Sequence, residues 1–293
     1  MKLSSGEKTF GVFNYIFFIL FSLAMIYPFW YSLVISLNNG MDSMRGGIYL
    51  WPRIFTLDNY FVVLTDSGLA RSYIVTVART VIGTLLSTFI TGIYGYALSK
   101  KWLLGRKAFL YFAIATMFFS GGLIPTYILY KNLHLTDNFL VYIVPTPISV
   151  WNMLIMKTFF EGLPESIEES AKIDGYNDIQ IFVRIVIPCS APVFAAIALF
   201  SGVWHWNSWF DSYIFVNKES LKTTQVILMS IINQSGANDV TANANRIRSG
   251  TQTITPKAVQ AATMIVTVLP ILFIYPFLQR YFVSGIMLGS VKA

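Results

Sequence analysis

Acidic side chains are more concentrated in one short stretch of this chain than anywhere else. Six of its fourteen acidic residues lie between positions 161 and 178, where Lys172 is the only basic residue. The six are Glu161, Glu165, Glu168, Glu169, Asp174 and Asp178. So much charge cannot lie in hydrocarbon, which indicates a polar segment outside the membrane core. Its carboxylates can pair with basic groups of another protein, although charge runs also occur in solvated loops without a partner.

The patterns that usually carry catalysis or metal binding are absent. No stretch has the spacing G-x-x-x-x-G-K-S/T, so the chain is not expected to bind nucleotide phosphates. G-x-S-x-G, H-E-x-x-H and paired-cysteine zinc patterns are missing too, and His134 and His205 fall in separate regions. The single cysteine, Cys189, allows no internal disulfide. We expect no catalytic residues, no metal and no cofactor in this chain.

The acidic stretch has the start and stop residues of a helix, a turn and a second helix. Pro164 suits the first turn of a helix, and nearby carboxylates complement the helix dipole, so a helix is predicted from Glu165 to Ile173. Gly175 can adopt the left-handed conformation that ends a helix. A second short helix is predicted over Asn177–Ile185, ahead of Pro188.

The rest of the chain has the composition of a membrane protein. Of its 293 residues 55% are hydrophobic and 12% are charged, against about 25% charged in soluble domains. A helix needs about 20 apolar residues to cross the hydrocarbon core. Six segments qualify, at residues 13–36, 73–98, 108–130, 139–156, 185–204 and 259–278. The sequence predicts an all-α polytopic protein with six transmembrane helices in one domain, residues 1–293. The first span should be retained, because it is too long for a signal peptide.

Charge in the loops predicts the orientation. Residues 100–107 hold four cations, whereas residues 131–138 hold one, so the former are placed in the cytoplasm. Both termini and the polar segment 161–184 then lie inside, and the loop 212–258 lies outside. The net charge of +7 is scattered over loops, which argues against nucleic-acid binding.

Several spans contain residues that indicate close packing or a broken helix. Small residues recur every fourth position in the second span, at Gly83, Ser87, Thr91, Gly95 and Ser99. They predict a ridge against a neighbouring helix. Gly121-Gly122 with Pro125 in the third span, and Pro145, Pro147 and Asn152 in the fourth, predict helix breaks that either line a pathway or are tolerated for packing. Residues 38–71, rich in Pro, Trp and Tyr, are predicted to form an ordered cap.

Arg79 lies about two turns into the second span, where an unpaired cation is costly. It either contacts substrate carboxylate or hydroxyl groups, or is structural and pairs with Asp66 or Asp211. The structural interpretation is slightly favoured. Trp204, Trp206 and Trp209 follow the fifth span and either stack on sugar rings or form an interfacial belt.

The polar segment also resembles a known signature. Glu169-Ser170-Ala171, Asp174-Gly175, the nine residues up to Ile185, and Ile187-Pro188 are similar to the EAA motif of ABC importer permeases. The resemblance implies a cytoplasmic coupling helix, between the fourth and fifth spans, that docks on an ATPase subunit. The coupling residues implied are Glu165, Glu168, Glu169, Ser170, Ala171, Asp174 and Gly175. Small Ala171 and Gly175 are expected to let that partner approach closely. Ser170 and Tyr176 depart from the usual motif.

Nearly the whole chain resembles the carbohydrate permeases of the maltose type, as their second permease subunit. Ile124-Pro125-Thr126-Tyr127, Trp206-Asn207 and the tail from Gln279 carry this resemblance; Tyr73, Arg79 and His134 depart from it. It is closest to permeases for complex oligosaccharides, including acidic ones such as alginate or pectin fragments.

The resemblance implies a set of partners in the bacterial cytoplasmic membrane. They are a second permease, two ATPase subunits that bind ATP and Mg, and an extracellular or periplasmic solute-binding protein. Arg246 and Arg248 are candidates for contact with the binding protein. The candidates for the substrate path are Arg79, Asn152, Trp206, Asn207 and Asp211.

Three other functions stay open from the sequence. An ABC permease for peptides or amino acids would share the EAA motif. An ion-coupled secondary transporter would need no ATPase, although the spans lack buried acids and an inverted repeat is not evident. A membrane-embedded enzyme acting on lipid or glycan would need a converging set of catalytic side chains, which the sequence does not offer.

Overall fold

The computed structural model describes residues 5–65, 67–238 and 255–290, and every regular element among them is helical, as predicted. In chain order the helices are α1 (Ser5–Ser36), α2 (Gly40–Met44), α3 (Asp58–Thr65), α4 (Ser67–Ser99), α5 (Arg106–Phe118), α6 (Leu123–Asn132), η1 (Phe139–Tyr142), α7 (Val150–Glu161), α8 (Glu165–Ile173), α9 (Asp178–Ile181), the π-helical turn η2 (Phe182–Val186), α10 (Ile187–Cys189), α11 (Ala191–Asn207), α12 (Phe210–Phe215), η3 (Glu219–Leu221), α13 (Thr224–Asn238) and α15 (Pro256–Ser290).

Contacts divide the chain into two compact units. The first comprises Met1–Leu69 and Leu228–Leu269, and the second comprises Ala70–Ile227 and Pro270–Ala293. Three helices, α4, α13 and α15, contribute residues to both units. The division therefore does not follow a linker, and the single domain stays a prediction.

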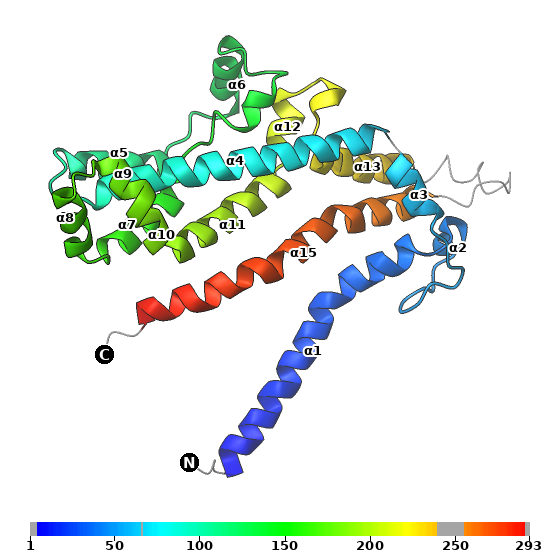
Figure 1. Ribbon diagram of the computed structural model, residues 1–293. Coiled ribbons are helices and arrows are strands. Elements are labelled where there is room, and N and C mark those ends of the chain that lie inside the picture. Colours follow the sequence, from blue (N-terminus) through cyan, green and yellow to red (C-terminus); the bar gives the residue numbers. More distant parts are fainter. Residues whose placement is uncertain (1–4, 66, 239–254, 291–293) are drawn as a thin grey trace. The chain divides into compact units, whose positions relative to one another are not determined.

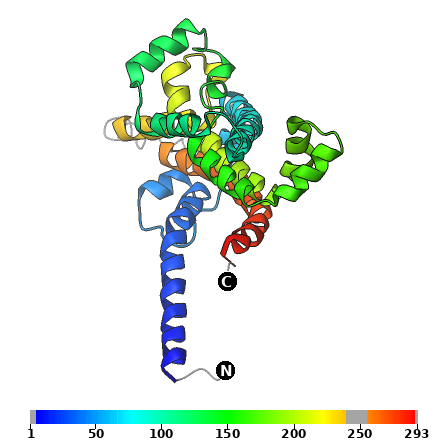
Figure 2. The ribbon, with the colours of Figure 1, turned by 90° about the vertical axis from the view of Figure 1, so that its left-hand side faces the viewer.

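In the first unit, α1 is a long helix whose N-terminal part is exposed (Figure 2). Its most apolar stretch of eighteen residues has no buried position. Only its end is packed, where Val34 and Ile35 form a small core with Ile48 and Ala261. Such a helix can be stable only if lipid or another protein covers its apolar surface.

The segment after α1 is ordered by amide hydrogen bonds, as predicted for residues 38–71, although Ser67–Arg71 already belong to α4. The fully buried Asn38 donates to Ser43 Oγ at 2.8 Å and accepts from the Ile54 backbone N–H at 2.8 Å. The Asn59 amide donates to the backbone oxygens of Ser36 and Asn38. Because these amides bond backbone groups distant in sequence, they fix the loop without a large apolar core.

In the second unit α4 is the central helix, and α11 lies alongside it (Figure 1). The predicted small-residue ridge is the contact surface. At Gly83 a Cβ atom would lie 2.6 Å from the imidazole of His205 on α11. At Gly95 it would lie 3.2 Å from the carbonyl oxygen of Met153 on α7. The Thr91 hydroxyl accepts from the Ser149 backbone N–H at 3.3 Å. The prediction of close packing along this ridge is confirmed.

Two predicted spans are bent pairs of helices. The axes of α5 and α6 differ by 114°, with the break at residues 119–122, and those of α9–α10 and α11 differ by 88° at Ser190. Gly121-Gly122 and Pro192 explain the two breaks, since neither glycine nor a proline favours an uninterrupted helix. The third span, 108–130, and the fifth, 185–204, are therefore not single straight helices.

The fourth predicted span, 139–156, is not one helix either. It consists of η1, an irregular stretch with Pro145 and Pro147, and the first half of α7. Proline removes a backbone donor and clashes with the preceding turn, so two prolines this close delay the helix to Val150. The described part of the predicted extracellular loop 212–258 contains η3 and α13, and its position outside the membrane stays a prediction. Arg246 and Arg248 lie outside the described residues.

Three described helices are long and apolar enough to cross a membrane: Gly6–Ser36, Ser67–Ser99 and Pro256–Ile274. Counting each bent pair as one span raises the number to five. The chain is thus a polytopic membrane protein by length and composition, and the difference from the predicted six is the interrupted stretch 139–156.

Candidate coupling site and the polar cluster around Arg79

The helix–turn–helix predicted in the acidic segment is present. α8 runs from Glu165 to Ile173, and Gly175 follows it with φ of +83°. The backbone N–H of Tyr176 donates to Ala171 O at 3.0 Å, and that of Gly175 donates to Lys172 O at 3.1 Å. This pair of bonds is the Schellman arrangement that closes a helix. The next helix, α9, starts after Asn177, whose side chain forms a capping box with Gln180. The turn thus has a defined geometry.

Four of the six acids of this segment, Glu161, Glu165, Glu168 and Asp178, are paired with cations from the same chain. Residues 100–107, here called the basic connector, follow α4, and α8 lies at that end of α4 (Figure 1). Lys100 pairs with Glu168, Lys101 with Glu165, and Arg106 with Glu161. Glu161 also pairs with Lys157 at 2.9 Å. Lys172 is the only basic residue within the segment itself, but Lys100, Lys101 and Arg106 bring further positive charge from a distant part of the sequence.

Ala171 does not face a partner. It is 4% exposed and packs in a core with Tyr96, Phe160 and Ile181. Its small side chain therefore lets α8 approach this chain's own core, which contradicts the expected close approach of a partner at this position.

Another face of α8 is open. Glu169, Ser170 and Asp174 are exposed, and no ion pair among the described residues involves either of these acids. Nothing lies within 4 Å of where a Cβ of Gly175 would be. Ile173 is 86% exposed and Ile179 is 75% exposed. A turn flanked by two exposed isoleucines and two unpaired carboxylates is suited to binding a protein.

A polar hollow of about 380 Å³ lies between the basic connector and α8. Lys100, Trp102, Glu168 and Glu169 contribute to its lining. The Lys172 ammonium sits 5.3 Å from the ring centre of Trp102, which adds a cation–π contact across it. The hollow belongs to the same junction as the ion pairs.

Arg79 has no exposed surface, and Asp211 is its counter-ion. Its guanidinium donates to both carboxylate oxygens of Asp211 and to Ser208 O at 3.1 Å. Its Cζ atom lies 4.6 Å from the ring centre of Tyr142. The geometry matches the structural interpretation of Arg79, and Asp66, the other suggested partner, lies outside the described residues. A bidentate pair of this kind is among the stronger polar contacts in proteins.

The Arg79 pair belongs to a larger set of buried hydrogen bonds, here called the polar cluster. The Tyr142 hydroxyl is bonded to Ser212 Oγ at 2.9 Å and donates to Leu221 O at 2.8 Å. The Thr224 backbone N–H donates to Thr76 Oγ1 on α4 at 2.9 Å. These bonds attach η1, α12 and the start of α13 to α4.

Asp137 joins the same region from the loop before η1. It has a left-handed backbone with φ of +56°, which an aspartate tolerates better than most residues. Its carboxylate accepts hydrogen bonds from the backbone N–H of Lys218 at 3.0 Å and of Asn217 at 2.5 Å. These donors lower the pKa of Asp137 from its ordinary value of 3.8. The carboxylate thus acts as a clamp between two loops.

The five candidates for a substrate path are not brought together. Asn152 is buried on α7, which packs on the Thr91–Gly95 part of α4, about 18 Å along that helix from Arg79. Trp206 is 6% exposed and meets Tyr73 edge to face at 5.9 Å. Asn207 is exposed and donates to Val203 O at 3.0 Å. Arg79 and Asp211 share the polar cluster.

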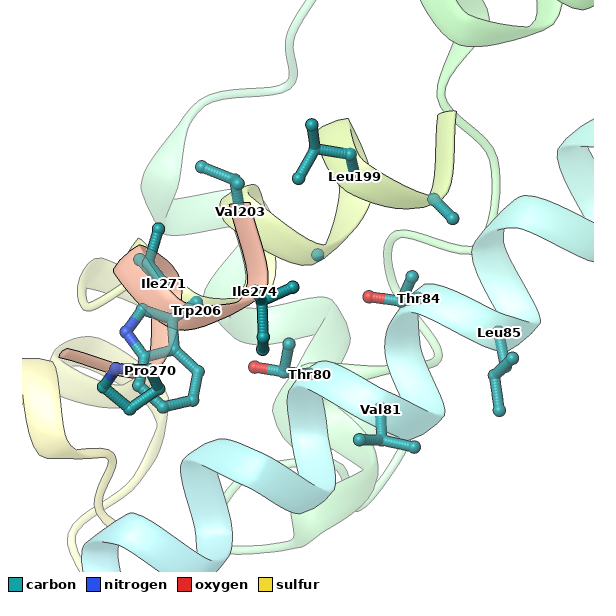
Figure 3. A pocket seen from close by; sticks show the side chains of 12 residues that line it. Thr80, Val81, Thr84, Leu85, Leu199, Val203, Trp206, Pro270, Ile271 and Ile274 are labelled. Carbon is teal, nitrogen blue, oxygen red and sulfur yellow. The ribbon is translucent and has the colours of Figure 1, made fainter. Parts of the chain in front are cut away.

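An apolar cavity of about 310 Å³ lies between α4, α11 and the part of α15 that begins at Pro270 (Figure 3). Trp206, Ile271 and Ile274 provide apolar surface. Thr80 and Thr84 line it too, and their buried hydroxyls have no hydrogen-bond partner among the described residues. The composition of the lining suits hydrocarbon better than a sugar.

Sequence reasoning missed Tyr96, Lys100 and Asp137 as functional residues. The sequence placed Lys100 among the cations of a predicted cytoplasmic loop, but it did not indicate its partner, which is 68 positions away. Tyr96 and Asp137 carried none, because their contacts depend on how distant segments meet.

Comparison with known proteins places the chain in a family, although no family model matches it. It is 35% identical over 286 residues to the polygalacturonan/rhamnogalacturonan transport system permease protein YtcP of Bacillus subtilis (strain 168), covering 98% of this chain and 99% of that one. It is 36% identical to the protein LplC of the same organism, covering 100% and 98%.

A solved structure agrees with these relatives. A crystal structure of a bacterial ABC transporter involved in the import of the acidic polysaccharide alginate contains a chain with a TM-score of 0.87 and 29% identity, covering 96% of this chain and 99% of that one. The similarity spans the polar segment, the bent helices and the polar cluster alike. The chain therefore belongs to the carbohydrate permeases of ABC transporters, which are multi-pass subunits without an ATPase of their own.

Proposed function

We propose that this permease imports an acidic oligosaccharide, of the pectin-fragment type, with ATP and Mg bound by two partner ATPase subunits. A second permease and an extracellular solute-binding protein complete the complex. The observation that carries the substrate class is the 35% identity to a polygalacturonan and rhamnogalacturonan permease over 98% of this chain. The likeness to a permease chain of an alginate importer supports it. Membership of the family argues against a secondary transporter or a membrane enzyme.

The orientation that fits this function has six spans, with both termini, α8 and the basic connector in the cytoplasm. The supporting observation is that Lys100, Lys101 and Arg106 pair with Glu168, Glu165 and Glu161, which requires the two segments to lie on one side of the membrane. Cation-rich loops favour the cytoplasmic side. The polar cluster around Arg79, in the N-terminal half of α4, then lies nearer the outside than the basic connector does.

We further propose that α8 and its turn are the surface that the ATPase grips. Glu169, Asp174 and Gly175 are exposed there beside Ile173 and Ile179. Of the remaining motif residues, Glu168 orients α8 on the basic connector, Glu165 forms a solvent-exposed pair with Lys101, Ser170 is exposed, and Ala171 packs α8 on the core. Closure of the ATPases would move α8 as part of a rigid body.

For the substrate path, we propose that the exposed Asn207 and the part-exposed Asp211 contact the sugar, and that Arg79 holds Asp211 in place. Trp206 and Asn152 then support the helices that line the path. Arg246 and Arg248 remain candidates for contact with the binding protein.

Reconstitution tests the substrate class. The chain is assembled in proteoliposomes with its second permease, the ATPases and a binding protein loaded with either oligogalacturonides or neutral arabino-oligosaccharides. We expect the acidic ligand to stimulate ATP hydrolysis and uptake, and the neutral one to stimulate neither. Equal stimulation by both would contradict an acidic substrate.

Gly175→Asp tests the docking surface. The substitution adds a charge at an open position, and aspartate tolerates the left-handed backbone, so the helix should stay folded. We expect the variant to insert into the membrane but to lose the ATPase subunits on purification. Normal copurification with normal uptake would refute docking at this turn.

A further inference from the structure

The three ion pairs between the basic connector and the acidic segment differ in their exposure to solvent. The side chains of Lys101 and Glu165 are 83% and 77% exposed. Those of Arg106 and Glu161 are 27% and 33% exposed. Those of Lys100 and Glu168 are only 14% and 15% exposed. An exposed pair is screened by water and adds little, whereas a shielded pair holds its two elements in one geometry.

Tyr96 completes the shielded pair. The Lys100 ammonium lies 4.3 Å from the ring centre of Tyr96, and the Tyr96 hydroxyl donates to Glu168 Oε2 at 3.3 Å. The tyrosine thus contacts both charges, through its ring face and its hydroxyl. It is itself only 7% exposed and lies in the core that also holds Ala171. The three residues form one unit at the junction of α4 and α8.

Two of these residues lie at the C-terminal end of α4 or directly after it, so a force on α8 would act on the end of this helix. Tyr96 is in the last turn of α4, and Lys100 follows the last helical residue, Ser99. The 33 residues of α4 span about 50 Å. The same helix packs on α7 at Gly95 and on α11 at Gly83. A displacement of the end of α4 would therefore be passed to two other helices.

We infer that Tyr96, Lys100 and Glu168 form a latch that fastens α8 to α4, so that movement of α8 by an ATPase is transmitted to the transmembrane helices. The inference rests on the proposed docking of α8. The three residues are positioning residues, since they touch neither nucleotide nor sugar. The exposed Lys101–Glu165 pair joins the same two segments without the aromatic contact, so it serves as a matched control.

The experiment uses the assembled transporter and compares Lys100→Met with Lys101→Met. Each removes one cation from the same connector. ATP hydrolysis stimulated by the loaded binding protein and sugar uptake are measured together, and their ratio gives the uptake per ATP. We expect Lys100→Met to keep its ATPase subunits but to lower uptake per ATP about tenfold, within the usual range of coupling free energies. Lys101→Met should stay within about twofold of the unaltered protein.

A charge exchange separates a latch from a folding defect. Lys100→Glu combined with Glu168→Lys restores an opposite-charge pair at the same place, so uptake per ATP should recover relative to either single change. Glu168→Gln should resemble Lys100→Met, and Tyr96→Phe should have a smaller effect, because it removes only the hydroxyl bond. Equal uptake per ATP in Lys100→Met and Lys101→Met overturns the latch, and so does an exchange variant no better than its single changes.

Cross-linking distinguishes failure of the latch from failure of the proposed docking. Ile173→Cys, in a background with Cys189→Ser, places a thiol on the exposed face of α8. A cross-link to the ATPase, together with equal uptake per ATP in the two lysine variants, overturns the latch alone. Absence of any cross-link to the ATPase refutes the docking, and the latch falls with it.

Discussion

Two ion pairs involve α4, one near its middle and one just after its last residue, and their cations are enclosed differently. Arg79 is fully buried, donates to Asp211 and to Ser208 O, and stacks on Tyr142. Lys100 also stacks on a tyrosine and pairs with a carboxylate, but its side chain is 14% exposed, while the two carboxylates, Asp211 at 21% and Glu168 at 15%, are both partly exposed. Burial deprives the Arg79 guanidinium of water, so it cannot lose its counter-ion without a large cost, whereas the partly exposed Lys100 ammonium can be hydrated when its pair opens. The Arg79 pair is therefore suited to hold α12 on α4 in all states, whereas the Lys100 pair at the C-terminal end of α4 can open and close again.

The sharpest test of this contrast removes one carboxylate from each pair. Asp211→Ala leaves Arg79 buried without a counter-ion and should lower the free energy of unfolding by about 3–5 kcal/mol. Glu168→Gln should cost less, because Lys100 can turn toward water. Thermal unfolding of the purified protein in detergent measures both. If Glu168→Gln costs as much as Asp211→Ala, the two ion pairs do not differ in this way.

Gly83→Ala tests whether the ridge of α4 depends on close contact with α11. The added methyl would lie 2.6 Å from the His205 ring, and overpacking of this kind costs about 1–3 kcal/mol. Gly11→Ala on α1 is the matched control, since nothing lies within 4 Å of that position. We expect only Gly83→Ala to lower the unfolding midpoint, and equal midpoints would show that His205 can move aside.

Gly175→Ala tests the turn after α8. A left-handed backbone costs an alanine about 1–2 kcal/mol, which should loosen the turn without adding charge. Gly121→Ala also adds a methyl group in open space, but at a glycine without positive φ. Amide hydrogen exchange across α8 should be faster in Gly175→Ala only. Unchanged exchange in both variants would mean that the turn does not control the order of α8.

The smallest effect is expected at Asp137. Its pKa is lowered by the backbone N–H groups of Lys218 and Asn217, so its contribution to stability is present above the ordinary value of 3.8 and is lost as the pH falls through its folded pKa. Asn also tolerates the left-handed backbone, so Asp137→Asn removes mainly the charge. The variant should have a lower unfolding midpoint than the unaltered protein at pH 7. This difference should shrink when the pH falls below 3.8, and a constant difference would contradict the assignment.

Local signals in the sequence predicted local structure well. Pro164 and Gly175 gave the bounds of α8, and the four-residue spacing of small side chains gave the ridge that packs on α7 and α11. Both features depend on neighbouring residues and on backbone conformation. Pro145 and Pro147 correctly indicated a break in the 139–156 stretch, whereas hydropathy, which only counts apolar residues, did not locate it or show that α7 starts at Val150.

The candidate sites were predictable only where an unusual residue demanded a partner. Arg79 in an apolar span required a counter-ion, and Asp211 was one of two acids suggested. Nothing in the sequence indicated that Glu168 pairs with Lys100, because each residue lies in a polar segment where water alone could solvate its charge. The number of carboxylates in the acidic stretch that are free to pair with another protein was therefore overestimated, since three of the six are paired with the basic connector.

The separation of Lys100 and Glu168 in the chain has a consequence for biosynthesis. The ribosome adds Lys100 to the chain 68 residues before it reaches Glu168. During that interval the cations of the basic connector have no partner in the acidic segment. Their charge is therefore not neutralised by that segment while the insertion machinery orients the early spans. Once α8 has been made, the same cations become part of a folded junction. The charges that direct the nascent chain are thereby reused, after insertion, to assemble the finished protein.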